Sequence, residues 1–137
     1  MQPWTPLLLK IKTAIEQASG HTFNSVLLNL YRDNQDSMGW HSDDETSLGK
    51  NPAIASFSIG ATRLFKMKHR YRPDIKTQSL PLLDGTLLVM AGPTQHFWKH
   101  AVDKTSAPSA ARINLTFRKI LRSDCVAAPA ILRQPML

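Results

Sequence analysis

The 137-residue sequence has one cysteine, Cys125, and no run of 18 apolar residues. A single cysteine forms no internal disulfide, which suits a reducing compartment. The first residues lack the basic-then-apolar pattern of a signal peptide, and no segment is apolar enough to span a bilayer. We therefore expect no membrane association and a cytoplasmic protein, or a nuclear one in a eukaryote. The length predicts one domain, placed at 1–120, in a monomer, with a loosely structured tail over 121–137.

Acidic residues are scarce in the second half of the chain. Residues 1–62 contain four Lys/Arg and six Asp/Glu, whereas residues 63–137 contain thirteen and four. A basic half beside a slightly acidic one suggests a polyanionic partner such as nucleic acid. A basic surface that only keeps the protein in solution explains the charge equally well.

Helical spacing of apolar residues occurs once, near the N-terminus. Thr5 can cap this helix, Pro6 suits its first turn, and Gly20 can end it. The pattern then changes to period two, with strand candidates at 22–33, 53–60, 63–72, 86–90 and 111–120 and weaker ones near 40–43, 77–82 and 99–103. About eight short strands predict a mainly β fold, a jelly roll or double-stranded β-helix, with the helix packed against it.

A metal site is suggested by "GWHSDDE" at 39–45. On a strand, His41 and Asp43 point to the same face, so both can reach one ion. A third ligand has to come from His21, His69, His96 or His100. Two histidines and one carboxylate with open positions suit non-haem Fe(II) and O2 chemistry. The alternative is an acidic surface loop beside a histidine without a ligand role.

The segment "ARINLTFR" places four polar side chains on one strand face: Arg112, Asn114, Thr116 and Arg118. Two guanidinium groups with an amide and a hydroxyl describe a receptor for a small dicarboxylate. Asn29 and Tyr31 offer similar groups on another strand. The alternative is an edge strand whose polar side faces water.

Four segments occur together in a specific order: "NLYRDNQDSMGWHSDDE", "SFSIGATRLF", "DGTLLVMAGPTQHFWKHAV" and "RINLTFR". From about Trp4 to Ile120 the chain resembles the AlkB-type Fe(II)/2-oxoglutarate dioxygenases, especially the branch that acts on alkylated bases in nucleic acids. The resemblance implies that His41, Asp43 and His100 bind Fe(II), with 2-oxoglutarate and O2 as cosubstrates. It also implies that Arg112 and Arg118 hold the carboxylates of 2-oxoglutarate, in an order left open, with help from Asn29, Tyr31 and Asn114.

The acids that follow Asp43 suggest how a substrate is recognised. The resemblance implies bases such as N1-methyladenine and N3-methylcytosine, which are cationic, so Asp44 and Glu45 are predicted to attract them. Asp44 is the preferred candidate of the two. The alternative is a pair of solvated acids in a loop.

A basic stripe is predicted on "RLFKMKHRYR", where cationic residues at 66, 68, 70 and 72 alternate with aromatic or apolar ones. Arg63 and Lys66 are the candidates for contacts with nucleic-acid phosphates. The alternative is an exposed strand whose charges maintain solubility.

The predicted function is oxidative removal of alkyl groups from nucleic-acid bases, in DNA or RNA repair. Members of the resembled branch usually carry a long segment before the first helix, which grips the base. This chain begins close to that helix, so it is expected to be either a catalytic core or a short relative. The alternatives are the same oxygenase chemistry on a protein side chain or small molecule, and a nucleic-acid-binding module with an idle metal site.

Overall fold

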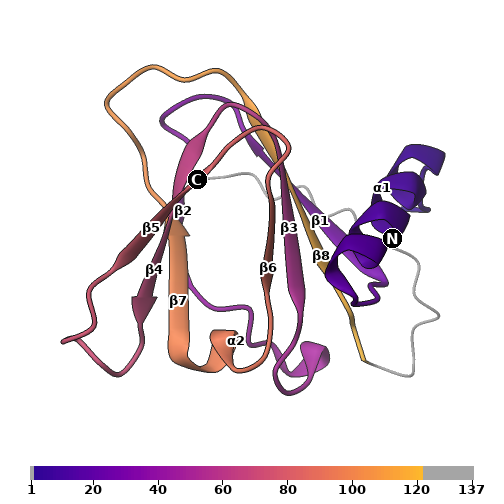
Figure 1. The fold of residues 1–137 in the computed structure, drawn as a ribbon. Helices are drawn as coiled ribbons and strands as arrows, with labels where there is room; N and C mark the ends of the chain where they lie inside the picture. The colour runs from indigo at the N-terminus through magenta and orange to yellow at the C-terminus, as the bar shows by residue number, and fades with distance from the viewer. Residues whose placement is uncertain (1, 122–137) are drawn as a thin grey trace.

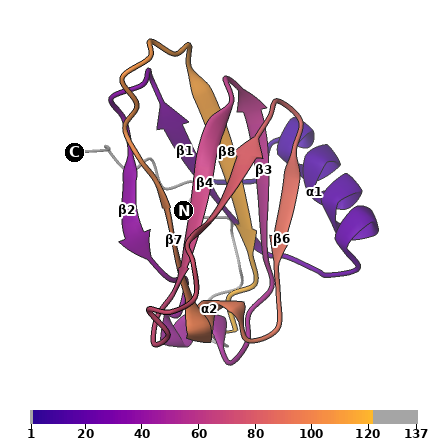
Figure 2. The same ribbon diagram turned by 60° about the vertical axis from the view of Figure 1, so that its left-hand side comes forward.

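The computed structural model describes residues 2–121, so the predicted tail lies, from residue 122, outside the described residues. The elements are α1 (Pro6–Ser19), β1 (Ser25–Tyr31), β2 (Met38–His41), a 3-10 turn (Thr46–Leu48), β3 (Ile54–Gly60), β4 (Arg63–His69), β5 (Gln78–Leu82), β6 (Leu87–Met90), α2 (Thr94–Phe97), β7 (Trp98–Val102) and β8 (Arg112–Arg118). Two four-stranded antiparallel sheets, ordered β1-β8-β3-β6 and β2-β7-β4-β5, face each other as layers (Figures 1 and 2). This confirms the predicted jelly roll with one N-terminal helix.

Helix α1 forms as its sequence predicts. The Thr5 hydroxyl accepts a hydrogen bond from the Leu8 N–H at 3.2 Å, which caps the first turn. Gly20 ends the helix in the left-handed region, at φ 73°, where a side chain is disfavoured. Within the described part of the chain, no helix combines the length and the apolar composition needed to cross a bilayer.

The first sheet is covered on its outer side by α1, which lies across it in Figure 1. Buried Leu8 and Ile15 of the helix pack with residues of β1, β3 and β8, namely Val26, Ala55, Leu115 and Phe117. Burial of these apolar side chains stabilises the pairing of helix and sheet, at roughly 1.5–3 kcal/mol for each large side chain that is fully buried.

Strand β8 lies in the middle of the first sheet, between β1 and β3. Asn114 is paired with Asn29 on one side and with Ser58 on the other. Leu115 and Phe117 face α1, whereas Arg112 and Asn114 are buried on the opposite face, which lines the space between the sheets. The alternative of an edge strand with its polar side in water is therefore wrong.

Candidate metal and anion site

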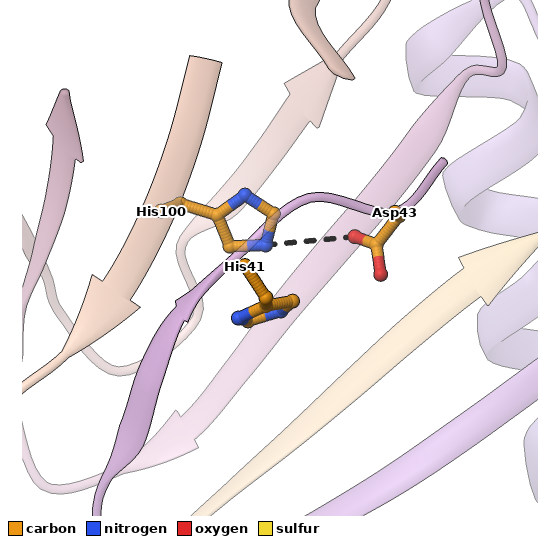
Figure 3. Close-up of side chains that lie close together, drawn as sticks. All are labelled: His41, Asp43 and His100. Atoms are coloured by element: carbon orange, nitrogen blue, oxygen red, sulfur yellow. Dashed lines mark ion pairs between the residues drawn. The ribbon is translucent and has the colours of Figure 1, made fainter. Parts of the chain in front are cut away.

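The structure brings together the three side chains predicted to bind metal. His41 is at the end of β2 and is paired directly with His100 on β7. Their ring centroids are 4.2 Å apart, and His100 Nε2 lies 3.5 Å from a carboxylate oxygen of Asp43 (Figure 3). One ligand atom from each of the three residues lies within 4.8 Å of the others, close enough to surround one ion.

The protonation states favour metal binding. His41 Nδ1 is 2.8 Å from the carbonyl oxygen of Gly39, an acceptor that places the ring proton on Nδ1 and leaves Nε2 free for a metal. Burial, together with the neighbouring His41, lowers the pKa of His100 to about 3, so this imidazole is neutral at ordinary pH. Burial raises the pKa of Asp43, an effect that His41 and Arg118 oppose.

The donor set fits Fe(II). Two imidazoles and one carboxylate form the three-ligand set of non-haem iron enzymes, which leaves coordination positions for a cosubstrate. The three residues line a cavity of about 240 Å³ between the two sheets, so those positions would face an enclosed space. That volume is below the roughly 300–1,000 Å³ of drug-sized sites and suits a compact ligand.

The opposite wall of the cavity carries a buried guanidinium group. Arg112 is 1% exposed and donates from Nη2 to the Ser58 hydroxyl at 2.9 Å. Its Nε and Nη1 have no hydrogen-bond partner within residues 2–121. A buried donor without a partner costs about 1–3 kcal/mol, more when charged, so this guanidinium is suited to a ligand that accepts from it. A carboxylate can accept a charge-assisted hydrogen bond from a free N–H of this guanidinium.

All five residues predicted to hold 2-oxoglutarate line this cavity: Asn29, Tyr31, Arg112, Asn114 and Arg118. The Tyr31 ring lies near two guanidinium groups, with its centroid 4.8 Å from that of Arg112 and 5.4 Å from that of Arg63. Burial raises the pKa of Tyr31, so its phenol remains protonated and can donate to an anion. Arg118 also has an Nε without a partner in the described chain, while its Nη1 is 3.3 Å from Glu45. The donors thus converge on one space from β1 and β8.

The two acids predicted to contact substrate are placed differently. Glu45 lines the cavity and pairs with Arg118. Asp44 is not among the lining residues; it points outward, with its side chain 55% exposed, and pairs with Arg70 at 3.2 Å. Of these two acids it is Glu45 that lines the cavity, and the preference for Asp44 as the substrate contact stays a prediction.

Arg63 does not lie on the surface. It is 3% exposed, and its guanidinium donates to the backbone carbonyls of Asp33, Asp36 and Asp103 at 3.0, 2.8 and 2.6 Å. The predicted phosphate contact is at odds with this burial, because Arg63 shares the inward face of β4 with buried Phe65. Lys66 points to the other face and pairs with Asp103 at 2.7 Å.

Several residues of the site were missed at the sequence level. On β3, Ser56 donates to Asn114 Oδ1 at 2.7 Å, and Ser58 accepts from Arg112 at 2.9 Å. Their alternation in "SFSIG" was an available signal, since it gives β3 an inward polar face. Gln95 is 2% exposed and accepts from the Asp43 N–H, and no spacing in the sequence indicates this.

Comparisons with known proteins agree with the geometry. The family model of the 2OG-Fe(II) oxygenase superfamily matches residues 1–118. Alpha-ketoglutarate-dependent dioxygenase alkB homolog 3 of Bos taurus is 49% identical over 124 residues, covering 85% of this chain and 43% of the relative. DNA oxidative demethylase ALKBH2 of Mus musculus is 40% identical over 126 residues, covering 88% of this chain and 53% of the relative.

The solved structure of OsALKBH1 superposes with a TM-score of 0.65 at 27% identity, covering 87% of this chain and 66% of that one. The chain spans less than half the length of the bovine relative. Because the family model matches most of the sequence and the site has the required donors, the chain belongs to the 2OG-Fe(II) oxygenase superfamily.

Proposed function

We propose that the protein is an Fe(II)/2-oxoglutarate dioxygenase that removes alkyl groups from damaged nucleic-acid bases. The observation that supports this most strongly is the cavity in which His41, Asp43 and His100 face two guanidinium groups across the sheets. The similarity to a relative named DNA oxidative demethylase points to an alkylated base as the substrate.

Each part of the cavity has a separate task. Bound Fe(II), with 2-oxoglutarate and O2, supplies the oxidising power to hydroxylate an N-alkyl carbon, after which the alkyl group leaves as an aldehyde, and succinate and CO2 form. His41, Asp43 and His100 hold the ion at one side of the cavity. Arg112 and Arg118 bind the two carboxylates of 2-oxoglutarate, and Tyr31 and Asn29 orient it toward the ion. Desolvation of a dianion is costly, so these buried donors replace its lost water.

Glu45 is the residue proposed to select a cationic base. Its side chain is 55% exposed, while the Arg118 side chain to which it is bonded is 13% exposed. The pair therefore extends from solvent toward the cavity. A carboxylate in this position attracts a base that carries positive charge, as N1-methyladenine and N3-methylcytosine do, and gains less from a neutral base.

Nucleic acid is the proposed partner, and the basic second half of the chain supports it. Lys66 stays a candidate for a phosphate contact, although Asp103 already neutralises it. Arg63 is not proposed for such a contact, because it is buried. The monomeric state and cytoplasmic or nuclear localisation remain predictions.

The direct test supplies the protein with Fe(II), 2-oxoglutarate, O2 and oligonucleotides that contain N1-methyladenine or N3-methylcytosine, as DNA and as RNA. We expect succinate release and loss of the methyl mass with methylated oligonucleotides, and neither with unmethylated ones or with His41→Ala. Succinate release that ignores methylation would contradict the proposal and favour a protein or small-molecule substrate. Nucleic-acid binding without metal binding would favour a binding module.

A further inference from the structure

One of the three metal-binding side chains lies outside the regular ladder. His41 is the last residue of β2 and His100 lies within β7, whereas Asp43 belongs to the loop that follows β2 (Figure 3). The β2–β7 pairing is itself irregular between Met38 and His41. The backbone at Asp43 therefore depends on other contacts to hold the carboxylate beside His100.

Gln95, in the single turn of α2, supplies such a contact. Its side-chain oxygen accepts from the Asp43 N–H at 2.8 Å, and its Nε2 lies 3.5 Å from the sulfur of buried Met90. The amide oxygen and the amide nitrogen of Gln95 each have a partner, and the residue is 2% exposed. These contacts hold the side chain in one orientation. Four residues separate Gln95 from the buried ligand His100, two at the end of α2 and two at the start of β7, so the contact links the loop ligand to the strand ligand.

The neighbouring contacts of the loop are of two kinds. The Ser42 hydroxyl donates to the Trp98 carbonyl oxygen at 2.7 Å, which also ties the loop to β7. The Asp44–Arg70 pair is partly solvated, and such exposed ion pairs hold structure weakly. Within residues 2–121, Gln95 is the side chain that bonds to the backbone of Asp43, and this hydrogen bond is partly buried, so leaving the N–H unpaired is unfavourable.

We propose that Gln95 is a positioning residue that orients Asp43 for metal binding. The side chain does not bind the ion; it fixes the backbone from which the carboxylate extends, before any metal arrives. The proposal rests on the metal site of the proposed function and is independent of the identity of the substrate. A residue that only filled space would be replaceable by any side chain of the same shape.

The test uses two substitutions of similar size in the full chain. Gln95→Met removes the oxygen that accepts from Asp43, whereas Gln95→Glu retains one. We expect Gln95→Met to weaken Mn(II) binding about tenfold, measured by calorimetry, and Gln95→Glu to stay within about threefold of the parent. The absorption spectrum of the Co(II)-loaded protein should change in Gln95→Met and be restored in Gln95→Glu. Ile15→Val, in the core on the far side of the first sheet, controls for lost stability.

A metal-free readout separates this proposal from the proposed function. Amide hydrogen exchange at Asp43 should be about tenfold faster in Gln95→Met than in the parent or Gln95→Glu, because the hydrogen bond is lost. The proposal would be overturned if a folded Gln95→Met kept the Asp43 exchange rate and the Mn(II) affinity of the parent. It would also be overturned if Gln95→Met and Gln95→Glu lost exchange protection and Mn(II) affinity equally. If the parent binds no Mn(II), the proposed function fails and the exchange rates alone decide the role of Gln95. Gln95→Asn, whose oxygen is set back by one methylene, replaces Gln95→Met if that variant does not fold.

Discussion

The two sheets contribute to the cavity in different ways. The side proposed to bind the anion comes from β1 and β8, two seven-residue strands whose pairing is regular over their full length. The side proposed to bind the metal comes from a four-residue edge strand, the loop after it and β7, with an irregular register. A continuous ladder fixes the guanidinium groups through the backbone, whereas the metal ligands depend more on individual side-chain contacts. We therefore expect substitutions to affect metal binding and 2-oxoglutarate binding separately.

The largest effect is expected from removing a ligand. His100→Ala should weaken Mn(II) or Fe(II) binding by more than about 100-fold, since loss of a supporting contact alone costs roughly 10–100-fold. Calorimetric titration measures this directly. Ile15→Val, which alters the helix-facing core, should bind the metal like the parent. Retained metal binding in His100→Ala would show that the three side chains do not share an ion.

A large and selective effect is expected on the other sheet. Arg112→Met should weaken 2-oxoglutarate binding by more than about 1.5 kcal/mol, because charge-assisted hydrogen bonds to a carboxylate are lost. Mn(II) affinity without 2-oxoglutarate should be nearly unchanged. Lys104→Met, which removes a charge from an exposed loop position, serves as the control. Unchanged 2-oxoglutarate affinity in Arg112→Met would mean that the cosubstrate lies elsewhere.

The stability of the metal-free protein should depend on pH through His100. Its pKa is lowered to about 3 by burial, against about 6.5 in an unfolded chain, so the unfolded state binds more protons between these values. The free energy of unfolding should therefore fall as pH decreases from 6.5 toward 3, by at most about 1.4 kcal/mol for each pH unit.

Asp43 works in the opposite direction, because its raised pKa lets the folded state keep a proton where the unfolded chain has lost it. Urea unfolding at several pH values, compared between the parent and His100→Gln, isolates the histidine. If the free energy of unfolding depends on pH equally in the parent and in His100→Gln, His100 is not the cause of this dependence.

The smallest effect concerns the two acids after Asp43. Glu45→Gln should raise KM for an N3-methylcytosine oligonucleotide a few-fold, in keeping with the roughly 0.2–1 kcal/mol of a partly exposed charge interaction. Asp44→Asn, the matched control, should change KM by less than about twofold, because Asp44 pairs with Arg70 outside the cavity. The reverse order would restore Asp44 as the residue that recognises the base.

The fold was predictable because its signals are local. Thr5, Pro6 and Gly20 mark the helix ends, and period-two alternation marks the strands, including the three weaker candidates that became β2, β5 and β7. The exposure of Leu30, 51%, was not predictable, because alternation assigns a side chain to a face of a sheet and does not say how much of that face is covered.

The candidate site was predictable only in part. His41 and Asp43, and the alternating residues of β8, are close in sequence, so their common face follows from strand geometry. The choice of His100 as the third ligand came from the family resemblance, since spacing alone left four histidines. The burial of Arg63 depends on three carbonyls from distant loops, and the role of Gln95 depends on the packing of α2 against the loop after β2. Long-range contacts of this kind leave no periodic pattern in a single sequence.

The proposed function requires one ion that faces bound 2-oxoglutarate inside the cavity, and an absorption spectrum can detect this arrangement. Fe(II) and 2-oxoglutarate added together without oxygen should give the parent a weak visible charge-transfer band, because the ion and the 2-oxo acid are in contact. The band should be absent in His41→Ala and weakened in Arg112→Met at limiting 2-oxoglutarate. No band in the intact, folded protein would contradict the central claim.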